Sequence, residues 1–160
     1  MTDSIISFIR SIGIPVYETT LEEDTFLPGL QIKAGELMVD KSRLLYPGDL
    51  LHEAGHIAVM PSAERPHLNE EAIKESKNRA AEEMMAIAWS YAATVYLDID
   101  PLIVFHDNGY KGGGSNIAEN FEQGHSFGVP MLQWCGMTTV PKRNSTEKYI
   151  FPNMKKWMRD

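Results

Sequence analysis

Two histidines and a glutamate lie close together in the sequence, in the order His52, Glu53 and His56, and match the pattern H-E-x-x-H. On an α-helix, side chains four residues apart stand on one face with about 5–6 Å between their Cβ atoms. Both imidazoles can then bind one Zn²⁺ at about 2.0–2.1 Å. Glu53 projects beside them and can hold a water molecule without being a ligand. The spacing predicts a zinc site with His52 and His56 as ligands and Glu53 as general base.

The residues around this motif predict the helix that the site needs. We expect a helix over residues 50–60, because Pro47 and Gly48 precede it, Asp49 can cap it and Pro61 ends it. Its apolar residues fall on the arc opposite the motif, namely Leu50, Leu51, Ala54, Ile57 and Ala58. The alternative interpretation is a pair of surface or core-edge histidines that hold no metal.

A third ligand is expected from a second, longer helix over residues 70–97, capped by Asn69. Its core-facing arc is predicted to comprise Ala80, Met84, Ile87, Ala88, Tyr91 and Val95. Glu83 borders this arc and is the predicted ligand, with Glu82 as the alternative and Glu75 as a solvated side chain. On the same face of this helix as Glu83 lie small residues that allow another helix to approach closely and could form hydrogen bonds to the ligands: Ser76, Ser90 and Thr94.

The HEAGH motif follows an expected hairpin and precedes a long helix that carries Glu83, Ala86, Ala88 and Trp89. In these features residues 26–97 resemble the gluzincins, zincin metallopeptidases whose third ligand is a glutamate on a following helix. The short bacterial members that cleave regulatory proteins are the most similar. The resemblance implies a zincin-like α+β fold, zinc bound by His52, His56 and a helix-borne glutamate, and Glu53 as the catalytic acid and base. It also implies a peptide or protein substrate.

Further polar residues lie in the last third of the chain. His106 or Tyr110 could donate a hydrogen bond to the tetrahedral intermediate of amide hydrolysis, the alternatives being an exposed loop histidine and a packed loop aromatic. The segment Lys111–Ser115 lacks the order of a phosphate-binding loop, so we expect a mobile flap or a surface connection there. Metallopeptidase activity is the leading hypothesis. A noncatalytic zinc-binding interaction or regulatory protein and a hydrolase of small amides or esters are the alternatives.

The remaining patterns predict one α+β domain over residues 1–160, with a small sheet or hairpin on the two main helices. A helix over residues 3–12 and a hairpin within residues 26–40 precede the motif. A short buried strand over residues 102–105 and a helix over residues 116–123, stopped by Gly124, follow the long helix.

Composition limits the partners and the compartment. The 160 residues include 15 basic and 22 acidic side chains, a net charge of −7 that disfavours nucleic acid and anionic membrane surfaces as partners. The single cysteine, Cys135, fits a reducing compartment, and the first ten residues lack the features of a signal peptide. We therefore expect a cytoplasmic protein, of an oligomeric state that the sequence leaves open.

Overall fold

The structure, a computed structural model, describes residues 1–22 and 24–160. Over these residues it confirms an α+β fold, with six α-helices and one three-stranded sheet. The helices are α1 (Thr2–Ser11), α2 (Asp49–Val59), α3 (Glu70–Glu75), α4 (Arg79–Leu97), α5 (Gly114–Glu122) and α6 (Val129–Trp134). The strands are β1 (Val16–Glu18), β2 (Leu30–Lys33) and β3 (Glu36–Val39). None of the helices in these residues is long and apolar enough to cross a membrane.

The hairpin predicted within residues 26–40 consists of β2 and β3, which pair antiparallel with Leu30 opposite Val39. Its two turn residues, Ala34 and Gly35, have φ angles of 53° and 73°, the positive values that a type I′ turn requires. β1 pairs parallel with the other side of β3, so the strand order is β1-β3-β2. β1 was not predicted from the sequence, because three residues are too few for an alternating pattern.

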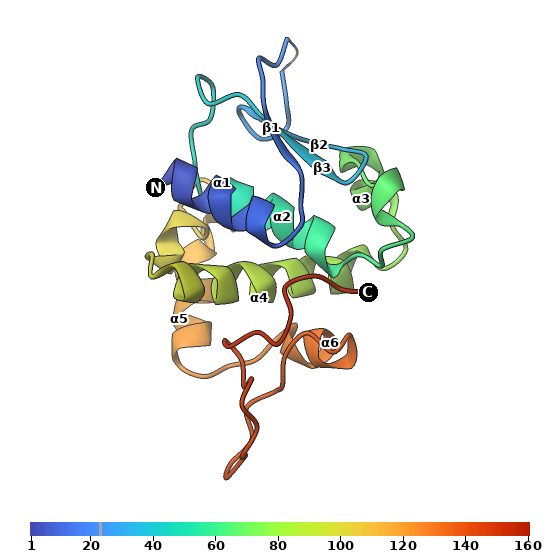
Figure 1. The fold of residues 1–160 in the computed structure, drawn as a ribbon. Helices are drawn as coiled ribbons and strands as arrows, with labels where there is room; N and C mark the ends of the chain where they lie inside the picture. The colour runs from blue at the N-terminus through green and yellow to red at the C-terminus, as the bar shows by residue number, and fades with distance from the viewer. Residues whose placement is uncertain (23) are drawn as a thin grey trace.

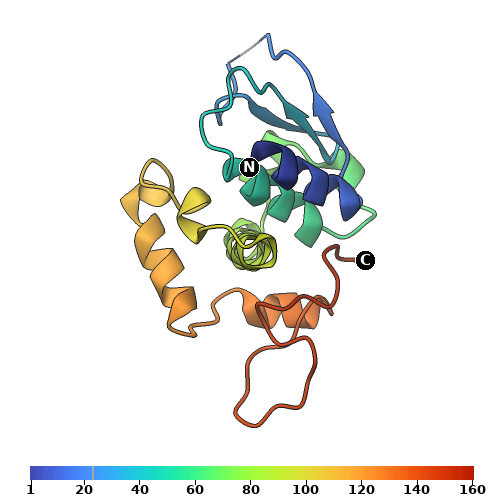
Figure 2. The ribbon, with the colours of Figure 1, turned by 60° about the vertical axis from the view of Figure 1, so that its left-hand side comes forward.

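α4 is the central helix of the fold and is covered on several sides. Figure 1 shows α1 and α2 between α4 and the sheet, and Figure 2, which looks nearly along α4, shows α5 and α6 beside it. Residues 85–94 of α4 are buried without a break. The predicted core-facing arc is therefore wrong at its ends, where Ala80, Met84 and Val95 are exposed. Neighbours enclose the middle of the helix instead of contacting one stripe along its whole length.

The single helix expected over residues 70–97 is wrong, because the chain breaks into α3 and α4. Ser76 is extended, with a ψ of 131°, and the three residues between the helices turn the chain. The predicted cap is confirmed, since the Asn69 side chain accepts a hydrogen bond from the amide of Ala72 at 2.8 Å. The break lets α3 lie beside β2 while α4 runs under α2.

The predictions for the last third of the chain are mixed. The strand expected over residues 102–105 is wrong, because Pro101 begins a 3-10 turn there. The carboxylate of Asp100 caps this turn by accepting a hydrogen bond of 2.9 Å from the amide of Leu102. The helix expected over residues 116–123 is confirmed as α5, and the φ of 85° at Gly124 follows its end. α6 was not among the helices expected from the sequence.

The C-terminal tail passes back to the central helices. Trp157 packs edge-on against Trp89, and its carbonyl oxygen accepts a hydrogen bond of 2.9 Å from the Trp89 indole nitrogen. Two residues later, the amide of Arg159 donates to the carbonyl oxygen of Ala58 at 2.9 Å. These contacts hold the tail to the C-terminal end of α2, the helix that carries the histidine motif.

Candidate metal centre

The two histidines of the motif lie on one face of α2, as the spacing predicts. Their Nε2 atoms are 3.2 Å apart and their rings are nearly perpendicular. His56 is buried and His52 is half-buried. Both ring nitrogens therefore converge on a single point at the surface of the helix.

Glu83 of α4 reaches the same point. One of its carboxylate oxygens lies 3.1 Å from Nε2 of His56, and the other lies 3.6 Å from Nε2 of His52. A tetrahedral ion with ligands at about 2.0–2.1 Å keeps its ligand atoms roughly 3.3 Å from one another. The separations of the three side chains match this value, and their atoms all lie within 4.8 Å of one another. The group could hold a metal ion.

The other glutamates considered as third ligands lie elsewhere. Glu82, although it neighbours Glu83 in the sequence, lines a separate hollow with Met60 and Glu64. Glu75 is exposed at the end of α3 and belongs to a different helix from Glu83. Of the three candidates, the structure thus brings Glu83 alone to the histidines.

The close approach of α2 and α4 brings the Glu83 carboxylate within reach of the two histidines. A Cβ atom at Gly55 would lie 2.9 Å from the carbonyl oxygen of Ala86, so a larger residue would force the helices apart. The hydroxyl of Ser90 donates to the same carbonyl oxygen at 2.6 Å, and that of Thr94 donates to the backbone of its own helix. These small residues allow close contact, but the predicted hydrogen bonds from them to the ligands are absent among the described residues.

Burial and the nearby charges set the protonation of the ligands. Burial lowers the pKa of His52 to about 3, so its ring is neutral and keeps a lone pair for a metal. Burial also disfavours the charged form of His56, but its hydrogen bond with Glu83 and the surrounding carboxylates outweigh that effect and raise its pKa. Burial likewise acts to raise the pKa of Glu83, and the two histidines outweigh it and lower that pKa.

Glu53 lies next to the ligand group on the wall of the same cleft. Burial raises the pKa of its carboxyl group from the ordinary 4.5 to about 7, with the carboxylates of Glu70 and Asp49 adding to the shift and His56 opposing it. It is not one of the three residues whose ligand atoms converge. A carboxyl group that titrates near neutral pH can both accept and return a proton.

Tyr110 contacts the first histidine of the motif. Its hydroxyl oxygen is 3.0 Å from Nδ1 of His52, and the rings meet edge to face. If Nε2 of His52 binds a metal, Nδ1 carries the proton and donates it to the tyrosine oxygen. With a metal on Nε2, this contact would hold His52 in that tautomer and orientation.

His106 and Asp49 form a second pair in the cleft. Nε2 of His106 is 2.9 Å from a carboxylate oxygen of Asp49, and the Tyr46 ring stacks on the imidazole with the centroids 4.0 Å apart. Nδ1 of His106 is buried and has no hydrogen-bond partner among the described residues. The expected cap at Asp49 is therefore wrong, because its side chain turns to His106 and Gly48 occupies the cap position. Nothing in the sequence pattern singles out Tyr46 or this role of Asp49.

These residues line one open cleft of about 510 Å³. His52, Glu53, His56 and Glu83 lie on it. Its lining also includes apolar residues, namely Phe26, Leu27, Pro28 and Ile73. Further lining residues can form hydrogen bonds, namely Tyr46, His106, Asn108 and Tyr110.

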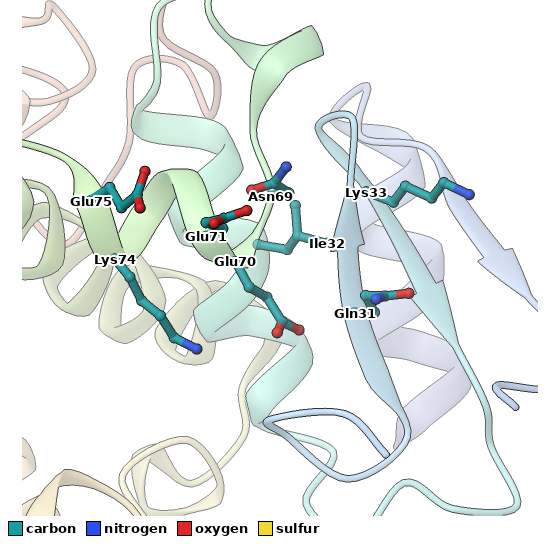
Figure 3. Close-up of a pocket in the computed structure, with 8 residues that line it drawn as sticks. All are labelled: Gln31, Ile32, Lys33, Asn69, Glu70, Glu71, Lys74 and Glu75. Carbon is teal, nitrogen blue, oxygen red and sulfur yellow. The ribbon is translucent and has the colours of Figure 1, made fainter. Parts of the chain in front are cut away.

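A second, more open hollow of about 830 Å³ adjoins the cleft between β2 and α3 (Figure 3). The two share Glu70 and Lys74 of α3. In Figure 3 the side chain of Ile32 points from β2 toward α3, whereas that of Lys33 points away. The cleft thus continues along the outer side of the sheet.

No protein-family model, curated protein or solved structure matches this chain. The interpretation of the site consequently rests on its own geometry. Three ligand atoms, a glutamate that titrates near pH 7 and two further hydrogen-bonding side chains meet in one accessible cleft. Two imidazoles and one carboxylate are groups that bind divalent metal ions in proteins.

Proposed function

We propose that this protein is a zinc-dependent metallopeptidase of the zincin type, in which His52, His56 and Glu83 hold the metal. The observation that carries the proposal is the position of Glu53, which lines the same cleft as the three converging ligands. A structural zinc site has four protein ligands and no need of such a group, whereas a catalytic site has three and an open position. The helix-borne third ligand is the feature shared with gluzincins.

When bound, Zn²⁺ supplies a water molecule of lowered pKa and a positive charge that polarises a carbonyl group. The chain's own residues move the protons. Glu53 accepts a proton from the attacking water and later returns it to the amine that leaves. Its pKa of about 7 in the metal-free chain suits both transfers.

A hydrogen-bond donor beside the metal centre would stabilise the negative charge that develops on the carbonyl oxygen. Tyr110 uses its oxygen to accept from His52, so its own proton is free to donate into the cleft. Burial, and then the carboxylates nearby, raise its pKa, so the hydroxyl keeps this proton. Of the two predicted donors we therefore propose Tyr110, because Nε2 of His106 is paired with Asp49 and its Nδ1 is buried.

The sheet edge supports a peptide as the substrate. β2 is an edge strand, and its outer side faces the hollow that adjoins the cleft. An extended peptide can add to such an edge through main-chain hydrogen bonds while its side chains occupy neighbouring hollows. A substrate bound in this way passes from β2 across the side chains of the candidate metal centre.

The test compares zinc-loaded wild-type protein with Glu53→Gln on a mixture of quenched fluorescent peptides. We expect cleavage by the wild type and a loss of at least about 100-fold in Glu53→Gln, with the zinc content unchanged. Glu82→Gln, next to the ligand Glu83 but outside the cleft, is the matched control and should cleave normally. Undiminished cleavage by Glu53→Gln, or no cleavage by zinc-loaded wild type, would contradict the proposal.

A further inference from the structure

The charges of the chain are divided unevenly along its length. Residues 134–160 carry six Lys and Arg side chains against two acidic ones, whereas residues 1–133 carry nine against twenty. The net charges are therefore +4 and −11. An asymmetry of this size points to a local electrostatic function of the C-terminal region that the overall charge of −7 conceals.

The basic region forms one part of the molecule in space. α6 and the loop that follows it lie on the side of α4 away from the sheet, and the tail runs from there back to the C-terminal end of α2 (Figures 1 and 2). Backbone hydrogen bonds join the residues after α6 to the tail. The amide of Thr139 donates to the carbonyl oxygen of Tyr149, and the amide of Lys155 donates to the carbonyl oxygen of Met137. No residue beyond Tyr110 lines the candidate active cleft, so this region is separate from it.

Exposed aromatic rings accompany the basic side chains. Trp134, at the end of α6, is 81% exposed, and the guanidinium group of Arg159 lies 5.7 Å from its ring centre. The ammonium group of Lys148 lies 5.2 Å from the ring of Tyr149, which is also exposed. A tryptophan this open to water offers a partner a large apolar ring to cover. We call these residues, together with the exposed Lys142, Arg143 and Lys155, the basic C-terminal surface.

Three basic side chains of this surface are available to a partner. Lys142, Arg143 and Lys155 are exposed and form no ion pair with the described residues. Lys156, by contrast, is paired with Asp160. Trp, Tyr and Arg are the residue types that contribute most binding energy at protein interfaces, and the surface presents all three.

We propose that the basic C-terminal surface binds an acidic segment of a partner protein, with an apolar or aromatic side chain of that segment on Trp134. A protein segment fits better than a nucleic acid. A strand of nucleic acid would extend its phosphates past the small surface and toward the part of the chain whose net charge is −11. A short acidic segment can end where the basic surface ends.

The test measures binding by fluorescence anisotropy and needs neither zinc nor turnover, so it stands apart from the test of peptidase activity. The probes are a labelled peptide of alternating Glu and Phe and a labelled oligothymidylate of equal charge. We expect the peptide to bind at about 20 mM NaCl and to weaken at about 150 mM, as screening requires. The double variant Lys142→Glu/Arg143→Glu and the variant Trp134→Ala should each weaken peptide binding by at least about tenfold.

The matched control is Lys77→Glu/Lys111→Glu, which changes the net charge equally at two exposed lysines outside the surface. It should bind the peptide within about twofold of the wild type. Equal losses in both double variants would show an effect of net charge alone and overturn the proposal. Absence of peptide binding, or tighter binding of the oligothymidylate than of the peptide, would overturn it as well.

Discussion

Replacing Glu53 with Gln is expected to stabilise the metal-free protein at neutral and alkaline pH and to have little effect in acid. The substitution keeps the shape of the side chain and removes its ability to ionise. In the folded chain the carboxyl group is buried, which raises its pKa from 4.5 to about 7. In the unfolded chain water solvates the group and its pKa returns to the ordinary value.

The sign and the size of the effect follow from this difference. Below about pH 4.5 the carboxyl group is protonated in both the folded and the unfolded chain, so its ionisation does not change the free energy of unfolding. As pH rises toward 7, the unfolded chain releases the proton while the folded chain still retains it, so the wild type loses stability. A shift of this size corresponds to roughly 3 kcal/mol at pH 8, since one pKa unit is about 1.4 kcal/mol.

Urea denaturation with a chelator present, repeated from about pH 4 to pH 8, measures the free energy of unfolding of both proteins. The variant should exceed the wild type by a margin that grows through this window. Glu75→Gln, on an exposed glutamate of α3, is the control and should follow the wild type at every pH. If the free energies of unfolding of Glu53→Gln and the wild type differed by the same amount at every pH, the buried environment assigned to Glu53 would be refuted.

Three further substitutions test the contacts that hold the site. Gly55→Ala places a Cβ atom 2.9 Å from the Ala86 carbonyl oxygen, so it should lower the free energy of urea unfolding by about 1–3 kcal/mol; an unchanged value would contradict the close helix contact. Tyr110→Phe removes the hydrogen-bond partner of a histidine ligand and should weaken zinc binding at least about tenfold in competition with a chelating dye. Trp89→Phe leaves the Trp157 carbonyl unpaired and should cost about 1–3 kcal/mol in thermal unfolding, whereas an unaltered melting temperature would count against that contact.

Local patterns in the sequence were enough to predict the helix of the histidine motif and the hairpin before it. The motif helix was expected over residues 50–60, and α2 spans Asp49–Val59, because proline and glycine at its ends act within a few residues. Periodicity was less informative for α4. A helix enclosed on several sides has no single apolar stripe, so the arc used to rank the glutamates was wrong at its ends.

The contacts that complete the site join residues far apart in the chain. Tyr110 is 58 positions from His52, and His106 is 57 from Asp49. Their residue types could be noted from the sequence, but their partners depend on how the loop after α4 folds back over α2. Asp49 is the clearest example of a contact that local sequence does not predict. Its neighbours in the sequence favour a helix cap, whereas in the fold its side chain contacts His106.

The zinc content of the purified protein, prepared without a histidine tag, tests the central claim most directly. We expect about one zinc per chain in the wild type and in Glu82→Ala, and loss of the metal in Glu83→Ala, because Glu83 and not Glu82 lies with the two histidines. Glu82→Ala is the matched control because it removes a neighbouring carboxylate that lies outside the ligand group. No zinc in the wild type after zinc addition and dialysis, or loss of zinc from Glu82→Ala instead, would contradict the assignment of His52, His56 and Glu83 as the metal ligands.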